Sequence, residues 1–117
     1  MNEQEKLESA LDFANYRITV QNQKHLLQTK TLELLSYYHN GGIFNITHEF
    51  MGFIGSLVAN EHTSLPLLDS NNNPIMIENL QEFYEEMLGQ YMEVVNEYWK
   101  EYEELKTKRN VKSVVNV

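Results

Sequence analysis

Residues 79–108, NLQEFYEEMLGQYMEVVNEYWKEYEELKTK, decide the fold, because their apolar side chains recur at helical spacing. Steps of three and four residues average close to the 3.6-residue turn, so these side chains share one face of a helix. The opposite face is rich in glutamate. The apolar positions are Leu80, Tyr84, Met87, Tyr91, Val95, Tyr98, Tyr102 and Leu105.

The start and the length of this helix can both be read from the sequence. Asn79 followed by Glu82 resembles a capping box, in which the asparagine accepts from free amides of the first turn. Thirty helical residues span about 45 Å at 1.5 Å per residue. A small compact domain cannot cover so long a stripe, so we expect a partner helix of similar length.

Residues 3–39 are predicted to form that second long helix, because they contain no glycine or proline. Its apolar face carries two adjacent stripes, which is typical of a helix with more than one neighbour. Gln21, His25 and Gln28 interrupt the first stripe. They form either a buried register-setting layer or a part of the stripe that has drifted to the surface. The first stripe is Leu7, Leu11, Ala14, Ile18, Leu32 and Leu35; the second is Phe13, Tyr16, Val20, Leu27, Leu34 and Tyr38.

The segment 41–78 is predicted to be a small α/β knob between the long helices. Asn40-Gly41-Gly42 ends the first helix, since glycine readily adopts the left-handed conformation of a helix terminus. Residues 43–46 are a strand candidate, and Thr47 is the expected N-cap of a helix from His48 to about Asn60.

Two apolar runs then surround a cluster of Asp, Asn and Pro residues, which predicts a β-hairpin over residues 65–68 and 75–77. Pro66 places its strand at an edge, because proline cannot donate to a ladder. The predicted fold is therefore mainly α with a small β element (α+β). Two long antiparallel helices flank a strand–helix–hairpin knob in a single elongated domain, residues 1–117, with a basic, Val-rich tail at 109–117.

Composition limits the function classes. The chain has 117 residues, no cysteine and a net charge of −8, and it contains no apolar run long enough for a membrane span. It begins with an acidic, polar segment rather than a signal peptide, so we expect an intracellular protein without a membrane partner. No lysine or arginine occurs between Lys30 and Lys100. This acidic body would repel phosphate backbones, so direct nucleic-acid binding is not expected.

Patterns that resemble chemical sites all have simpler interpretations. The order strand, helix, two-strand wing resembles a winged helix, but the middle helix lacks basic residues for phosphates. His25, His39, His48 and His62 show no metal-ligand spacing. Residues 69–73 resemble a calcium loop but lack its glycine and its bidentate glutamate, so a turn is favoured. We predict no enzyme, no cofactor and no metal.

Protein contacts are the remaining expectation. Phe83, Met92 and Trp99 fall beside the main stripe, and large aromatic side chains at such edges often mark interfaces. The basic residues Lys106, Lys108, Arg109 and Lys112 gather near the C-terminus. This tail either clamps onto an acidic partner, a symmetry mate or a nucleic-acid-rich particle interior, or is a frayed end.

Four segments resemble small uncharacterised proteins of T-even-type tailed phages of marine bacteria: ALDFANYRITVQNQK, NGGIF, LLDSNNNPI and NEYWKEYEELKTKRNV. The resemblance implies a phage protein made in the bacterial host cytoplasm, with a role in virion structure or assembly. The resemblance assigns no functional role to any residue of this chain. The outline of helix, strands and helix is also similar to prefoldin subunits, as a likeness of shape alone.

Two functional hypotheses follow. The first is a non-enzymatic structural or assembly protein whose long helices self-associate, as a homo-oligomer, or dock on a larger phage complex. The second is an acidic inhibitor or regulator that presents its carboxylates to a basic surface of a host or phage nucleic-acid enzyme. Raised salt separates them, because only the second depends mainly on charge.

Overall fold

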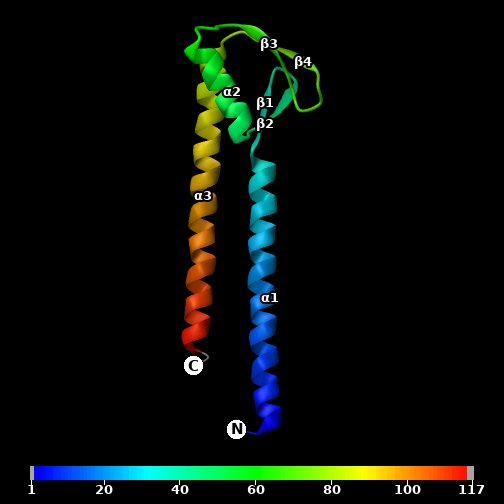
Figure 1. Cartoon of the computed structure of the whole chain (residues 1–117), viewed down its shortest axis with the longest axis vertical. Helices are drawn as coiled ribbons and strands as arrows, with labels where there is room; N and C mark the ends of the chain where they lie inside the picture. The colour runs from blue at the N-terminus through cyan, green and yellow to red at the C-terminus, as the bar shows by residue number, and fades with distance from the viewer. Residues whose placement is uncertain (1, 116–117) are drawn as a thin grey trace. The chain divides into compact units, whose positions relative to one another are not determined.

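The computed structural model describes the backbone of residues 2–115 and the side chains of residues 2–107. The elements are α1 (Glu3–Leu34), β1 (Ser36–His39), β2 (Gly42–Asn45), α2 (His48–Ala59), β3 (Leu65–Leu68), β4 (Pro74–Ile77) and α3 (Leu80–Val115). Figure 1 shows the two long helices and the shorter elements that connect them in sequence. The predicted fold class, α+β with two long helices and a small strand-containing knob, is confirmed.

Contacts group the chain into two units. Unit 1 consists of Met1–Lys30 and Tyr98–Val117, and unit 2 consists of Thr31–Glu97. Unit 1 therefore contains most of α1 and the C-terminal part of α3. Unit 2 contains both hairpins, α2 and the N-terminal part of α3.

The first long helix ends earlier than its periodicity predicts. Residues 36–39 form β1 instead of a last helical turn, so the prediction of one helix over 3–39 was wrong. Asn40 (φ 48°) and Gly41 (φ 79°) both adopt positive φ, as in the two-residue turn that joins antiparallel strands. Tyr37 then pairs with Phe44, and His39 with Gly42. Asn-Gly is thus a hairpin signal here rather than a helix end.

Unit 2 has a second hairpin, β3–β4, whose loop is fixed by Asp69. The predicted hairpin is confirmed, with Leu65 opposite Ile77 and Leu68 opposite Pro74. The Asp69 carboxylate accepts backbone N–H bonds from Asn71 (3.0 Å), Asn73 (2.8 Å) and Ile43 (3.2 Å). The bond from Asn73 is the largest of the effects that lower the pKa of Asp69, with smaller contributions from Ile43 and Asn71 and an opposing one from burial. The Asp/Asn-rich segment is therefore a carboxylate-stabilised turn, as predicted.

The helix caps were well predicted. Thr47 accepts from the N–H of Phe50 at 3.1 Å and begins α2, and Asn79 accepts from the N–H of Glu82 at 3.1 Å and begins α3. The C-terminal end of α3 was not well predicted. The helix runs to Val115, so the predicted end at Lys108 was wrong.

The core of unit 2 is built around Phe83. Its ring lies edge-on to the rings of Tyr37, His39 and Phe44, at centroid distances of 5.3, 5.2 and 5.1 Å. Such edge-to-face pairs add to the effect of apolar burial. The most completely buried side chains of this core are Phe44, Ile54, Ile77, Leu80, Phe83 and Met87.

A hydrogen-bonding side chain of α3 secures the transition from α1 to β1. The Gln90 amide donates to the carbonyl oxygens of Leu34 (3.0 Å) and Ser36 (2.8 Å). These carbonyls lie where the helical hydrogen bonds stop, and such groups need outside donors. Gln90 therefore helps to fix the residue at which α1 gives way to the strand.

Candidate interaction surface

The structure contradicts one predicted interface residue and leaves two in exposed positions. Phe83 is fully buried, so its assignment to an interface was wrong. It faces the β1–β2 hairpin and α2, because α3 packs on both and buries a wider face than a single stripe. Met92 and Trp99 are 54% and 64% exposed and remain interface candidates.

The tyrosines of α3 also divide between different neighbours. Tyr84 and Tyr91 were expected to face the first helix, but in unit 2 they contact α2. The Tyr84 ring lies against Gly55, and the Tyr91 hydroxyl hydrogen-bonds the His48 Nε2 at 2.8 Å. In unit 1, by contrast, Tyr102 lies under the ammonium group of Lys24 of α1, 5.1 Å from the ring centroid.

The basic C-terminal residues are described only in part. The Lys106 ammonium group lies 3.4 Å from the Glu103 carboxylate and 5.3 Å from the Tyr102 ring centroid. Exposed pairs of this kind contribute little to stability. The side chains of Lys108, Arg109 and Lys112 lie outside the described residues, so their predicted interface role stays a prediction.

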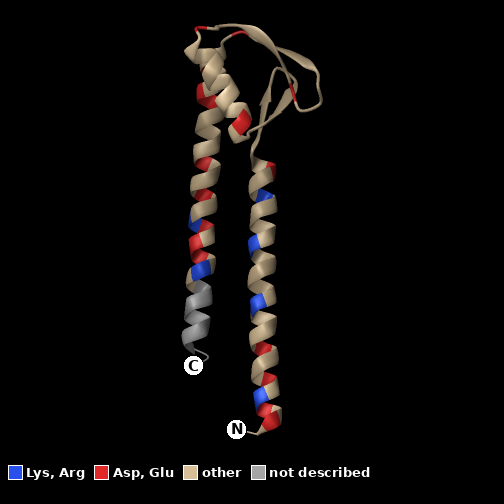
Figure 2. Cartoon of the chain, viewed as in Figure 1, with Lys and Arg blue, Asp and Glu red and all other residues tan. Residues whose placement is uncertain are grey.

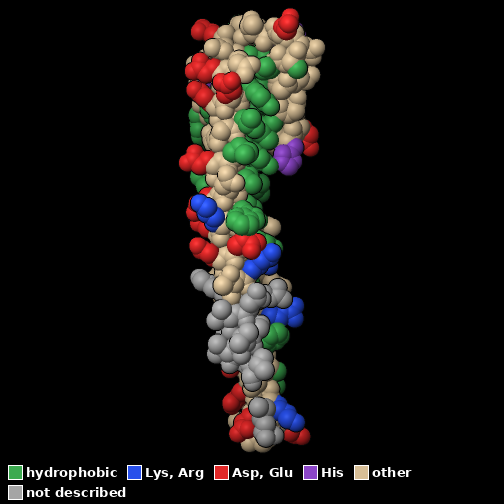
Figure 3. All heavy atoms as spheres, turned by 90° about the vertical axis from the view of Figure 1, so that its left-hand side faces the viewer, with side chains coloured by type: hydrophobic (Ala, Val, Ile, Leu, Met, Phe, Trp, Pro, Cys, Tyr) green, Lys and Arg blue, Asp and Glu red, His purple; other side chains and the backbone are tan. Residues whose placement is uncertain are grey.

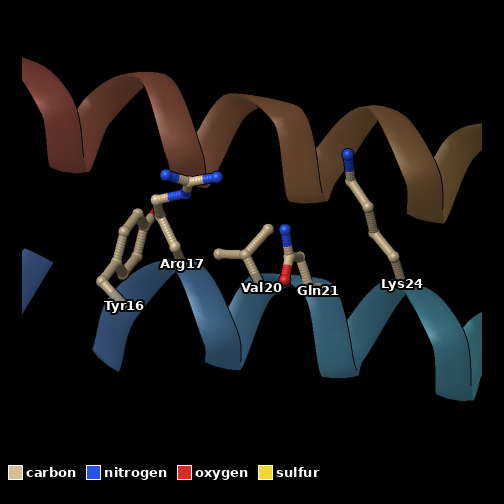
Figure 4. Close-up of a pocket in the computed structure, with 5 residues that line it drawn as sticks. All are labelled: Tyr16, Arg17, Val20, Gln21 and Lys24. Carbon is tan, nitrogen blue, oxygen red and sulfur yellow. The ribbon is translucent and has the colours of Figure 1, made fainter. Parts of the chain in front are cut away.

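In unit 1, α1 and α3 run side by side (Figure 1). The face of α1 that contacts α3 does not carry the first apolar stripe. Among the described side chains of α1 in this unit, Val20 is buried, at 6% exposed, and Tyr16, Lys24 and Leu27 are half-buried. Figure 4 shows Tyr16, Val20 and Lys24 extending from α1 toward the neighbouring helix. At the end of the contact, the Lys30 ammonium group lies 3.5 Å from the Glu101 carboxylate.

The first apolar stripe of α1 is left exposed by this packing. Leu7, Leu11 and Ile18 are 60%, 54% and 54% exposed. At 100° per residue, Ile18 lies about 160° around the helix from Val20. The first stripe therefore faces away from α3, and the second stripe supplies Val20 and Leu27 to the helix pair, so the prediction that the two stripes are adjacent was wrong.

Unit 2 has exposed apolar side chains of its own. In the upper part of Figure 3, hydrophobic side chains gather over α2 and α3. Phe53 of α2 is 54% exposed, and Leu88 and Met92 of α3 are exposed one helical turn apart. Apolar groups clustered in this way are typical of protein contact surfaces.

The hollow on α1 is smaller than a small-molecule site, and two larger hollows, of about 350 Å³ between α1 and α3 and about 540 Å³ beside Trp99, are shallow and open to solvent. The first, of about 90 Å³, is lined by Tyr16, Arg17, Val20, Gln21 and Lys24 of α1 alone (Figure 4). Sites for small organic ligands usually measure several hundred Å³ and bring together side chains from several elements. Among the described residues no group of three or more His, Asp and Glu side chains is placed to hold a metal ion. None of the described helices has both the length and the apolar content needed to cross a membrane.

The hydroxyl group of Tyr37, in unit 2, has a strongly raised pKa. The Tyr37 hydroxyl donates a hydrogen bond to the Glu86 carboxylate. Burial raises the pKa of Tyr37 far above its ordinary value of 10.0, and the hydrogen bond and charge of Glu86 raise it further. Glu86 lies on the exposed side of α3, so this hydrogen bond joins β1 to the surface of the helix.

This pair predicts a specific loss of stability in alkali. Unfolded protein would release the tyrosine proton near pH 10, whereas the folded protein retains it, because the folded-state pKa is raised. The contribution of Tyr37 is thus fully present below pH 10 and falls as the pH rises above it. Urea unfolding at pH 9 and at pH 10.5–11 should show a larger drop for the wild type than for Tyr37→Phe. Equal drops would show that the hydroxyl does not titrate differently in the two states.

Comparisons of the chain with protein-family models, with curated proteins and with solved structures gave no match. The geometry of the chain itself therefore carries the functional argument.

Proposed function

We propose that this protein is a non-enzymatic structural or assembly protein of a tailed phage, acting through protein–protein contacts of its long helices. The observation that carries the proposal is the set of large apolar side chains left exposed on these helices, including Leu7, Leu11 and Ile18 on α1 and Met92 and Trp99 on α3. Exposed tryptophan and methionine at helix surfaces are typical of residues that dominate binding.

The phage setting is supported by the resemblance of the four sequence segments named above. It implies synthesis in the bacterial host cytoplasm and the virion as a possible destination. The partner is then either a second copy of the chain or a larger phage assembly. Docking of this kind buries apolar surface, so its affinity should change little with ionic strength.

The acidic regulator is the second candidate, and the charge distribution favours it. Figure 2 shows acidic residues along α3, and Glu82, Glu85, Glu93 and Glu97 are exposed. A basic surface on a nucleic-acid enzyme would be attracted to this row. Such binding should weaken steeply as salt is raised and should be lost when Glu82 and Glu93 are changed to lysine.

Affinity capture from lysates of phage-infected and uninfected cells separates the two functions. We expect a phage-encoded partner to be retained at raised salt, and Trp99→Ala to reduce its apparent affinity about tenfold or more. Met92→Ala should also weaken capture, whereas Met76→Ala should not. Met76 is a matched control, since it is 51% exposed against 54% for Met92 but lies on β4.

The contrary results are equally clear. Retention that disappears at raised salt and with the two lysine substitutions, but is unaffected by Trp99→Ala and Met92→Ala, would favour the acidic regulator. Equal losses with Met92→Ala and Met76→Ala would mean that the long helix is not the contact surface.

A further inference from the structure

The exposed face of α1 in unit 1 has the pattern of a coiled-coil seam. Leu7, Leu11, Ala14 and Ile18 follow steps of four, three and four residues, and all four are exposed. Two-stranded coiled coils bury side chains at this spacing between their helices. Because α3 packs on the other side of α1, near Val20, this seam is free to accept another helix.

The charges of α1 indicate which helix fits. Residues 3–12 contain Glu3, Glu5, Glu8 and Asp12 with a single lysine, and residues 13–30 contain only basic charges, Arg17, Lys24 and Lys30. Figure 2 shows this separation, with acidic residues near the N-terminal end of α1 and basic ones further along. Two copies in parallel would bring like charges together. Two antiparallel copies bring the acidic residues 3–12 of each helix beside the part of the other that holds Arg17 and Lys24, which favours association, while Lys30 stays with Glu101 of α3.

We propose that two copies of this chain pair through α1 as an antiparallel coiled coil, with a two-fold axis between residues 12 and 13. This register places Leu7 of each copy opposite Ile18 of the other, and Leu11 opposite Ala14, so the apolar positions meet one another. Residue n then lies opposite residue 25 − n, and Gln21, His25 and Gln28 lie at or beyond the end of the overlap. The same surface on both copies forms the contact, as a two-fold dimer requires.

The antiparallel register also accounts for the interruption of the heptad stripe. In a parallel pair, Gln21, His25 and Gln28 would be brought together in the seam, where buried polar groups cost stability unless they are all hydrogen-bonded. In the antiparallel pair His25 and Gln28 lie beyond the overlap, in water, and Gln21 lies only at its end, opposite Gln4. The inference rests on the proposed function, since it specifies one partner of the same helical surfaces.

Cysteine cross-linking tests the proposal directly, because the chain contains no cysteine. Leu7→Cys and Ile18→Cys are made in separate full-length chains of different tag length, mixed and oxidised. A disulfide needs Cα atoms about 4.4–6.8 Å apart. Leu7 and Ile18 lie about 16 Å apart along one helix, so only the antiparallel register brings them together. We expect mainly the mixed product, in which one Leu7→Cys chain is joined to one Ile18→Cys chain, at least tenfold above either self-linked product.

Leu26→Cys is the matched control. Leu26 is 67% exposed on the same helix, but it lies about 80° around from Ile18. It should not cross-link with Leu7→Cys, and all three variants should keep the helical circular dichroism of the wild type, since the sites are exposed. Self-linked products in place of the mixed one would overturn the antiparallel pairing. Equal yields with Leu26→Cys, or no product, would overturn the seam. Neither result would alter the Met92 and Met76 comparison, which tests the proposed function separately.

Discussion

Replacing Phe83 with alanine is expected to lower the free energy of unfolding by about 3–5 kcal/mol, the usual cost of removing a buried aromatic side chain. Phe83 is 0% exposed and contacts the rings of Tyr37, His39 and Phe44, so its loss leaves a cavity where α3 meets the first hairpin. Urea unfolding followed by circular dichroism measures the change. This loss of unfolding free energy should exceed the loss for a substitution at any exposed residue of α3.

Trp99→Ala is the control for this prediction. It removes a larger aromatic side chain from the same helix, but Trp99 is 64% exposed, so the change in unfolding free energy should stay within about 0.5 kcal/mol. The two substitutions therefore separate a folding role from a binding role. A small effect at Phe83, or a large one at Trp99, would mean that the two faces of α3 have been assigned the wrong way round.

Gly42→Ala is expected to destabilise unit 2 by about 1–3 kcal/mol, the usual cost of overpacking. A Cβ atom at this position of β2 would lie 2.6 Å from Cγ1 and 3.0 Å from Cδ1 of Ile75, and 3.3 Å from Cε2 of Phe44. Ile75 belongs to β4 and is packed against the core, so relief requires its side chain to leave its packed position or the two hairpins to move apart. Thermal unfolding of the variant should show a lower midpoint.

Gly52→Ala makes the same chemical change with the opposite expected sign. Gly52 lies within α2, and a Cβ atom there would meet nothing within 4 Å. Alanine is favoured over glycine in a helix by about 0.5–1 kcal/mol, so this variant should be slightly more stable than the wild type. If both substitutions destabilised the protein equally, the close approach of β2 and β4 would not be the cause.

Local signals in the sequence predicted the elements that depend on them. Thr47 and Asn79 begin helices because their side chains accept the free amides of a first turn, and this chemistry is visible in the sequence. Asn40-Gly41 shows the limit of such reasoning. The same residues suit a helix end and a hairpin turn, and what decides between them is the pairing of Tyr37 with Phe44, a tertiary contact.

The interface residues show the same limit. Phe83 falls beside the stripe defined by Leu80, Tyr84 and Met87, yet it is as fully buried as Leu80 and Met87. Periodicity identifies the direction of the apolar face but not its width, and the width depends on how many elements pack on the helix. On α1 both stripes were visible, but the sequence did not show that the second stripe, rather than the first, packs on α3.

Light scattering coupled to size exclusion, on the full chain over a range of concentrations, tests the self-association account most directly. We expect the mass to rise with concentration from the 13.8 kDa of one chain toward twice that value, and to do so at raised salt as well. Leu11→Glu should hold the protein at 13.8 kDa, whereas Leu26→Glu, an equally polar change on the same helix, should leave the dimer intact. A wild-type mass of 13.8 kDa at every concentration, or equal loss of the dimer in both variants, would contradict the account.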